Sequence, residues 1–109
     1  MKSLSLKSRH WLVNKEGQIV FGEGRKKIFE NIEQTGSMYQ TARNTKMSYK
    51  AVWSKIKASE KAVNATLVEK LGTRGSRLTK DGKALLEAYN KMQKRCLKSD
   101  DKIFESTFK

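Results

Sequence analysis

One stretch decides the fold of this chain: Thr35 to Lys61, TGSMYQTARNTKMSYKAVWSKIKASEK. Ser37 and Ser48 each precede a segment whose apolar residues recur with helical spacing. A serine hydroxyl at such a position accepts a hydrogen bond from a backbone N–H in the first turn of the helix. The turn between the two segments falls at Asn44-Thr45-Lys46. Two short helices joined by a tight turn are typical of a helix-turn-helix.

The second of these helices, Tyr49 to about Asn64, has two chemically different sides. A helical wheel places on one side Tyr49, Val52, Ile56 and Val63, and on the other Lys50, Ser54, Lys57, Ala58 and Lys61. Trp53 lies at the edge between them. A lysine stripe is often only a solvated face, but the small residues here allow close approach to a groove, so we expect this helix to enter the DNA major groove. The inward face of the preceding helix is expected to consist of Met38, Tyr39 and Ala42.

The overall charge favours a polyanionic partner. The 109 residues, enough for one domain or one domain with a tail, include 24 Lys and Arg against 11 Asp and Glu, for a net charge of +13. Such an excess suits DNA, RNA or an anionic membrane surface. A membrane partner is disfavoured because no stretch approaches the roughly 20 apolar residues of a spanning helix. The first residues also lack the apolar run of a secretory signal.

Too few reactive side chains are present to suggest an enzyme or a metal site. Cys96 is the only cysteine and His10 the only histidine, so an internal disulfide and a structural zinc site are both excluded. The single cysteine suits a cytoplasmic location. A catalytic triad, a P-loop and a complete dinucleotide-binding motif are missing. We therefore expect no catalysis and no cofactor.

The segments before the helix-turn-helix suggest a hairpin followed by a helix. Two β-prone runs, residues 10–14 and 18–22, flank a short turn with a glycine. Trp11 and Val13 should share one face of the first strand, and Ile19 and Phe21 one face of the second. Trp11 could stack on a base, but a role in the core or in an interface is favoured. Residues 25–34 then show helical spacing, and Gly36 marks the end of that helix.

The segments after it suggest a wing and a long helix. Residues 66–71 and 77–78 are β-prone and flank a tight loop in which Arg74, with Arg77 beside it, would suit phosphates or a narrow minor groove. Thr79 should cap the last helix, which is expected to end near Leu97 or Lys98. Its apolar stripe is longer than a small domain needs, which suggests a second copy of the chain as partner; the stripe consists of Leu85, Leu86, Tyr89, Met92 and Cys96. Residues 99–109 are either disordered or folded over the dimer.

Five motifs between residues 10 and 95 recur in a known arrangement: Gly22-x-Gly24-Arg25, Ile32-x-x-Thr35-Gly36-Ser37, Met47-Ser48-Tyr49-Lys50-Ala51-Val52-Trp53, Leu67-Val68 and Arg77-Leu78-Thr79-x-x-Gly82. Together with the hairpin, they resemble the N-terminal DNA-binding domain of the ModE family of molybdate-responsive transcriptional regulators, a relative of the LysR-type winged helix. The resemblance implies a dimer on a palindromic operator, with Tyr49, Lys50, Trp53 and Ser54 near DNA. The family's glycine-rich wing is reduced here to Gly72-Thr73-Arg74-Gly75. Its oxyanion-binding domain has no counterpart in this sequence, so no molybdate site is identifiable and a stand-alone form is expected.

These observations lead to one expected architecture. The fold should be mainly α with small β elements: a winged helix-turn-helix with an N-terminal β-hairpin and a long C-terminal dimerisation helix. Residues 1–9 should be a flexible N-terminus, residues 10–98 the DNA-binding domain including the dimerisation helix 79–98, and residues 99–109 a tail.

The expected function is sequence-specific binding of double-stranded DNA by a homodimeric transcriptional regulator on an inverted repeat. The expected DNA contacts are Ser37, Thr41, Ser48, Tyr49, Lys50, Trp53, Ser54, Lys57, Lys61, Arg74 and Arg77. An RNA-binding winged helix stays open, because the charge suits it equally. A protein-interaction module that uses the last helix with Phe104 and Phe108 also stays open, and an oxyanion sensor has no residues that specify it.

Overall fold

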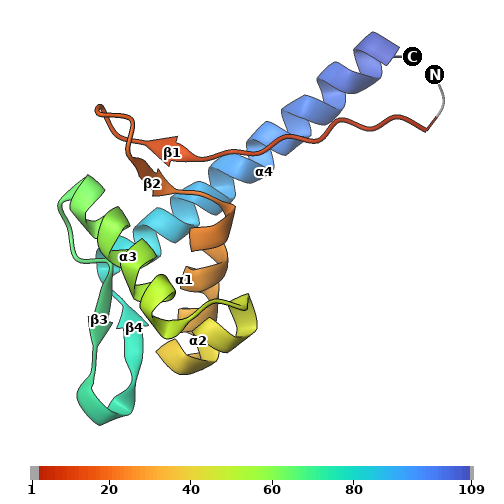
Figure 1. Cartoon of the computed structure of the whole chain (residues 1–109). Coiled ribbons are helices and arrows are strands. Elements are labelled where there is room, and N and C mark those ends of the chain that lie inside the picture. The colour runs from red at the N-terminus through yellow and green to blue at the C-terminus, as the bar shows by residue number, and fades with distance from the viewer. Residues whose placement is uncertain (1–2, 109) are drawn as a thin grey trace.

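The computed structural model describes residues 3–108. Within that range the elements are, in chain order, β1 (Leu12–Val13), β2 (Ile19–Phe21), α1 (Glu23–Thr35), α2 (Met38–Thr45), α3 (Tyr49–Val63), β3 (Val68–Lys70), the 3-10 turn η1 (Gly72–Arg74), β4 (Ser76–Leu78) and α4 (Lys80–Phe108) (Figure 1). The expected fold class, a winged helix-turn-helix with an N-terminal hairpin and a long last helix, is confirmed.

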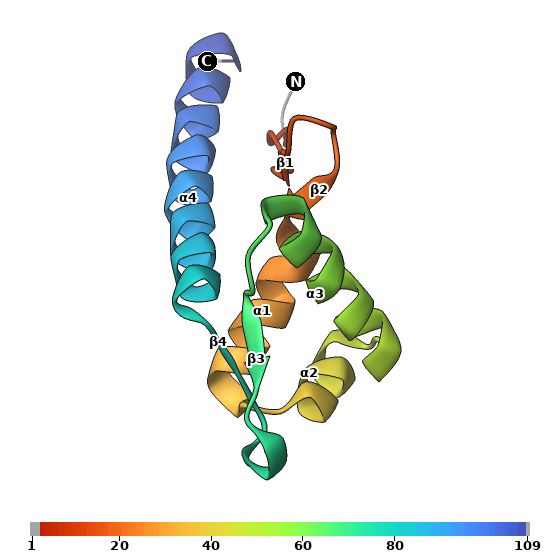
Figure 2. The same ribbon diagram turned by 90° about the vertical axis from the view of Figure 1, so that its left-hand side faces the viewer.

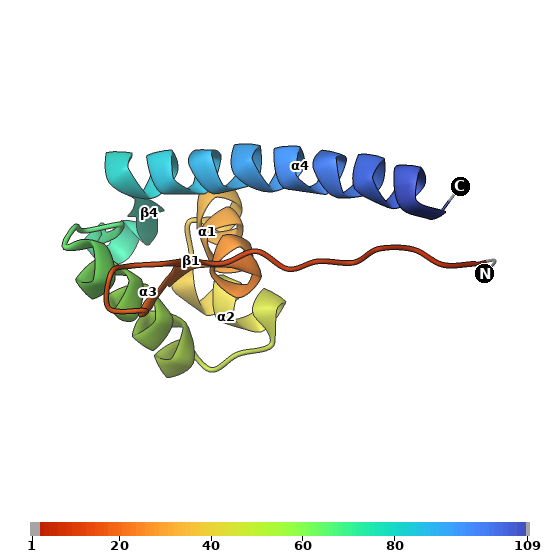
Figure 3. The same ribbon diagram turned by 90° about the horizontal axis from the view of Figure 1, so that it is seen from above.

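Helix α1 lies at the centre of the molecule. The long helix α4 packs on one side of it, and α2 and α3 pack on the other (Figures 2 and 3). Aromatic rings join these layers, because the Phe21 ring meets Phe29 of α1 edge to face at 5.0 Å and Tyr89 of α4 at 5.1 Å. All three side chains are fully buried, so the hairpin, α1 and α4 share one core.

The hairpin differs from the expected regular alternation. Leu12 pairs with Phe21, but Val13 pairs with Ile19, so one strand carries an extra residue. A bulge of this kind places neighbouring residues on the same side of the strand. Val20 and Phe21 are therefore both buried, whereas Ile19 is 51% exposed. The expectation that Ile19 shares the buried face of Phe21 is wrong.

Three other side chains lie farther out than their sequence pattern suggests. Tyr39 is 75% exposed rather than part of the inward face of α2. This helix has only eight residues, and Met38, Thr41 and Ala42 already fill its buried side. Trp11 is 60% exposed, so it is not in the core. Val63, 37% exposed, belongs to the last turn of α3.

Local signals set the ends of the central helices as expected. Gly36 adopts a left-handed conformation after α1 and donates its N–H to the Ile32 carbonyl at 2.8 Å. The hydroxyls of Ser37 and Ser48 accept hydrogen bonds from the backbone N–H groups of Gln40 and Ala51, at 3.1 and 3.0 Å. These bonds replace helical partners that the first turn lacks.

The wing is attached to the body at both of its strands. Ser76 at the start of β4 donates its N–H to the Gly36 carbonyl at 2.9 Å. The chains approach so closely there that a Cβ on Gly75 would lie 2.1 Å from the Gly36 oxygen. At the other strand, the Glu60 carboxylate of α3 accepts the N–H groups of Leu67 and Val68 at 2.8 and 3.2 Å. The wing therefore has a fixed position beside α3.

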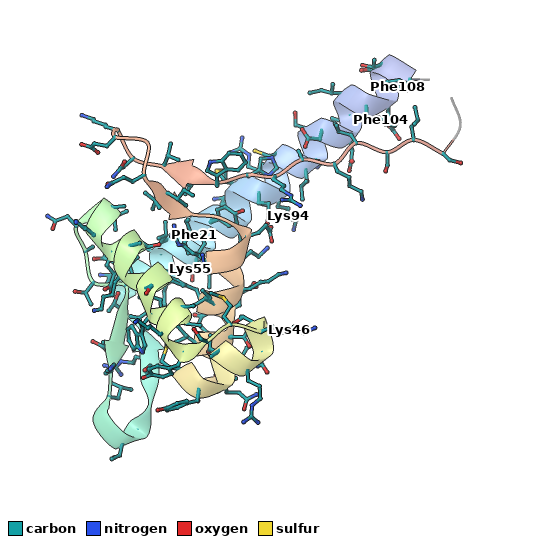
Figure 4. The ribbon with its side chains drawn as sticks, viewed as in Figure 1. Phe21, Lys46, Lys55, Lys94, Phe104 and Phe108 are labelled. Atoms are coloured by element: carbon teal, nitrogen blue, oxygen red, sulfur yellow. The ribbon has the colours of Figure 1, made fainter. Side chains whose placement is uncertain are left out.

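Helix α4 extends well beyond the body. It continues to Phe108, so the expectation that it ends near Lys98 is wrong, and the described part of the tail is helical. Gln93 is the last buried residue along it. Beyond that point, residues 3–9 run alongside the helix (Figures 1 and 3). Figure 4 shows Phe104 and Phe108 at the far end, distant from the Phe21 core. Within residues 3–108, no helix combines the length and apolarity needed to cross a membrane.

Candidate nucleic-acid interface

Helix α3 presents a cationic face to solvent. Its opposite side is anchored in the core by Val52, Ile56 and Ser59, and the Ser59 hydroxyl donates to the Val20 carbonyl at 2.6 Å. This anchoring fixes the rotation of the helix about its axis. The exposed face then consists of Lys50, Ser54, Lys57, Ala58 and Lys61. The two-sided pattern predicted for this helix is therefore present, except for Val63.

A row of three aromatic rings crosses from α2 to α3 along the edge of this face. The Tyr39 ring stacks on the Tyr49 ring, with centroids 4.5 Å apart and planes inclined by 29°. Tyr49 in turn meets Trp53 edge to face at 6.5 Å. These ring contacts join α2 to α3 beside the cationic face.

Two lysines lie over the face of Trp53. The Lys70 ammonium, from wing strand β3, is 4.8 Å from the ring centroid, and that of Lys57 is 5.5 Å away. A cation over an indole face is stabilised by the ring quadrupole, by about 0.5–1 kcal/mol at an exposed site. Lys57 also pairs with Glu60 at 3.3 Å. Trp53 therefore links α3 to the wing through Lys70, and Lys57 of α3 adds a second positive charge over the ring.

A groove of about 520 Å³ separates the helix N-termini from the wing. One wall carries Ser37, Tyr39 and Tyr49, and the other carries Lys70, Thr73 and Arg74. The walls thus combine hydroxyl groups with cations, which is the donor set that contacts phosphate oxygens in protein–DNA complexes.

The two wing arginines are not equivalent. Arg74 lies exposed in η1 at the tip of the wing. Arg77, on β4, forms an ion pair with Glu69 of β3. A contact from Arg77 to a phosphate would have to compete with that carboxylate, whereas Arg74 has no ion pair among the described residues.

One residue from the predicted set does not fit the surface. Thr41 is fully buried on the inner side of α2, and its hydroxyl has no hydrogen-bond partner in residues 3–108. The inward face predicted for this helix did not include Thr41, because α2 is too short to define its buried side by periodicity. The remaining predicted contacts are half-buried or exposed, namely Ser37, Ser48, Tyr49, Lys50, Trp53, Ser54, Lys57, Lys61, Arg74 and Arg77.

Three residues lie on this surface that sequence reasoning did not select: Tyr39, Lys70 and Thr73. The alternation of β3 could have indicated Lys70. Lys70 is two positions after the buried Val68, so both side chains share the face of the strand that is turned toward the body, and Lys70 lies at the exposed end of that face. No local pattern indicates Tyr39. Its stacking on Tyr49 depends on the angle between α2 and α3.

The stripe predicted for dimerisation divides between two sides of α4. Leu86 and Tyr89 face inward and are 4% and 0% exposed in the chain's own core. Leu85, Met92 and Cys96 are half-buried on the remaining side. A shallow groove of about 560 Å³ follows that side, lined by Ala88, Lys91, Met92, Arg95, Cys96 and Ser99. Among the described residues, no group of His, Cys, Asp and Glu side chains is arranged to hold a metal ion.

Comparison with known proteins gives a consistent result. The family model described as "Bacterial regulatory helix-turn-helix protein, lysR family" matches residues 25–83. The chain is similar to CbnR, a LysR family transcriptional regulator, with 27% identity and a TM-score of 0.59 over 73% of this chain. The DNA-binding domain of CbnR, solved in complex with DNA, gives 26% identity and a TM-score of 0.62 over 78% of this chain and 98% of that domain. The chain spans only 28% of full-length CbnR. No curated protein sequence matches the chain.

Proposed function

Because the chain belongs to the LysR family of bacterial helix-turn-helix regulatory proteins, we propose that it regulates transcription by sequence-specific binding of double-stranded DNA. The members of this family are DNA-binding regulators and are not classed as enzymes. The observation that carries the proposal is the continuous surface from Tyr39 across the lysines of α3 to Lys70 and Arg74. Helix α3 lies in the major groove in this proposal, and the wing lies against the adjacent backbone.

The contacts divide into two classes. Lys50, in the first turn of α3, is the best candidate to reach a base edge, with Ser54 one turn further on. Lys70, Arg74 and the hydroxyls beside the groove are suited to phosphates. Phosphate contacts position the protein on DNA, and base contacts select the sequence.

The proposed assembly is a homodimer on an inverted repeat. The exposed side of α4, with Leu85, Met92 and Cys96, is the proposed contact with the second copy. Cys96→Glu tests it, because Cys96 lies on this side of α4 and does not pack against the monomer core. Sedimentation should show a dimer for the wild type and a monomer for the variant. If the variant is a dimer like the wild type, this side of α4 is not the dimer interface.

Selection of bound sequences from a random duplex pool tests binding, specificity and symmetry together. A dimer should select two inverted half-sites whose centres are about 34–36 Å apart, one turn of DNA. A footprint over a single asymmetric half-site would contradict the dimer. Competition between duplex DNA and structured RNA at physiological salt addresses the RNA-binding alternative, and the duplex should compete better.

A closer relationship to the ModE family is part of the proposal. Its support is the hairpin before α1 and the motif from Met47 to Trp53, which begins at the end of the helix-turn-helix turn and continues into α3. If the relationship holds, the selected sequences should resemble the operators of ModE-family regulators. A selected sequence of a different type would leave only the LysR-type assignment.

The division of the chain and its location are also proposals. Residues 10–98 would form the DNA-binding and dimerising unit, residues 1–9 a flexible arm and residues 99–109 a tail that is continuous with α4 up to Phe108. Residues 1, 2 and 109 lie outside the described range. Limited proteolysis should cleave first within residues 1–9. A cytoplasmic location follows from the proposed access to DNA.

A further inference from the structure

A network of polar side chains joins α4 to the body at the point where α4 leaves it. Gln93 is 9% exposed and is the last buried residue of the helix. Its amide oxygen accepts a hydrogen bond from the Lys26 ammonium at 2.9 Å. Its amide nitrogen donates to the Glu23 carboxylate and, at 3.4 Å, to the Tyr89 hydroxyl. We call Glu23, Lys26, Tyr89 and Gln93 the Gln93 network.

The network also includes the start of the hairpin. The Tyr89 hydroxyl donates to the His10 carbonyl at 2.7 Å. Three segments therefore meet at one place: the first turns of α1, the midpoint of α4 and the chain that leads into β1. None of these residues belongs to the DNA-contacting surface described above, so their role in DNA binding would be indirect.

The chemistry of the network favours one orientation of α4. Glu23 and Lys26 are three residues apart on α1 and carry opposite charges, so each engages a different end of the Gln93 amide. Hydrogen bonds with one charged partner are stronger and more directional than neutral ones. Apolar contacts such as those of Leu86 hold the helix against the body but tolerate small rotations. The amide resists rotation, because turning it would separate the buried Gln93 side chain from Lys26 and Glu23.

A small change of direction at this point has a large effect at the far end of the helix. Lys94 to Phe108 comprise 15 residues, which span roughly 22 Å at about 1.5 Å per residue. A rotation of about 10° at Gln93 would therefore move the end of α4 by about 4 Å, close to the axial rise of one base pair. In a dimer whose contact extends along the projecting half of α4, where Leu97 and Ile103 are 42% and 58% exposed, this displacement changes the distance between the two bodies, and by symmetry it occurs in both copies.

From this geometry we infer that the Gln93 network is a positioning device that sets the spacing between the two half-sites of the operator. The inference rests on the proposed dimer and goes beyond it. The surface of α3 and the wing determines which bases are selected. Gln93, through Glu23 and Lys26, determines how far apart and at what angle two such surfaces are held.

The test is selection with the full chain from a pool in which the spacer between two fixed half-sites varies in length. Wild-type protein should select one spacer. Gln93→Ala should select spacers that differ by about one to two base pairs, as the displacement of the helix end requires. Lys26→Met, which keeps an apolar stem at a half-buried position, should do the same and can be measured if Gln93→Ala does not fold. Gln34→Ala makes the same chemical change as Gln93→Ala at an exposed site on α1 and should keep the wild-type spacer.

The outcomes separate this inference from the proposed function. Broadened spacer selection by Gln93→Ala or Lys26→Met, with unchanged affinity for a single half-site, supports a positioning role, because general instability would weaken single half-site binding too. A single, unchanged spacer for both variants overturns the inference while leaving the dimeric regulator intact. If wild-type protein selects no paired half-sites at all, the proposed dimer fails, and the role of Gln93 fails with it.

Discussion

Substitution of Lys70 is the most direct test of whether the wing and α3 form one DNA-binding surface. Its ammonium lies over the Trp53 ring, 4.8 Å from the centroid, and it lines the groove between the wing and the helix N-termini. Lys70→Gln removes the charge and keeps a polar side chain of similar length. The ladder between β3 and β4 should persist, because it is formed by the backbone. We therefore expect a folded protein with weaker and less salt-sensitive DNA binding.

The expected size follows from counterion release. Each lost phosphate contact lowers the slope of log affinity against log salt concentration by about 0.9. A dimer loses two such contacts, so the slope should fall by about 1.8. Between about 50 and 200 mM salt, the wild type should lose roughly tenfold more affinity than the variant.

The assay is a fluorescence-anisotropy titration of a labelled duplex at several salt concentrations. Lys94→Gln is the matched control, because it removes the same charge from the +13 total at an exposed site on α4 (Figure 4). It should leave the slope nearly unchanged. Trp53→Leu should give part of the Lys70→Gln effect, since the ring restrains the lysine, and the double variant should have the slope of Lys70→Gln alone.

Equal slopes for wild type, Lys70→Gln and Lys94→Gln would contradict this prediction. In that case Lys70 does not contact phosphate, and its position over Trp53 serves only the packing of the wing. A reduced slope in Lys70→Gln combined with full additivity in the double variant would refute only the restraint by Trp53.

Four further changes test the remaining assignments. Lys50→Ala should relax preference at one base position by about 1–3 kcal/mol, measured by selection; a uniform loss over all sequences would make Lys50 a phosphate contact. Arg74→Ala should weaken binding to all sequences and flatten the salt dependence, and an unchanged slope would remove the wing tip from the interface. Glu60→Ala should lower the free energy of unfolding by about 2 kcal/mol in denaturant titrations, because two backbone N–H groups lose their acceptor; Glu60→Gln, which keeps an acceptor, should cost less. Burial and the Glu23 carboxylate raise the pKa of Tyr89 above its usual 10.0. Stability should therefore be complete below pH 10 and fall as pH rises above it, since the unfolded tyrosine ionises first; Tyr89→Phe should remove that part of the fall, and an identical pH profile would contradict the assignment.

Local sequence signals were sufficient to predict the order and the ends of most elements. Ser37, Ser48 and Thr79 begin helices as predicted, and Gly36 ends one, because these signals act on the backbone of the next few residues. The cationic side of α3 was likewise predictable, since a helix of 15 residues is long enough for its periodicity to define two sides.

The side-chain contacts between elements depend instead on how the helices and strands pack together. Tyr39 stacks on Tyr49 because of the angle between α2 and α3, and Lys70 lies over Trp53 because Glu60 holds the wing beside α3. Pairs so far apart in sequence leave no periodic signal.

The long helix α4 shows the same limit most clearly. Its sequence carries one continuous apolar stripe, but its first half packs in the core and its second half projects from the body. The stripe therefore divides, because Leu86 and Tyr89 are buried within the chain, whereas Met92 and Cys96 are half-buried on the side of α4 for which we propose contact with a second copy. Helical spacing indicates which residues share an apolar side of a helix, but it does not indicate which part of the molecule packs against that side. The packing of α1 against α4, which ends at the hydrogen bonds of Gln93 to Lys26 and Glu23, decides which residues of the stripe are covered within the chain.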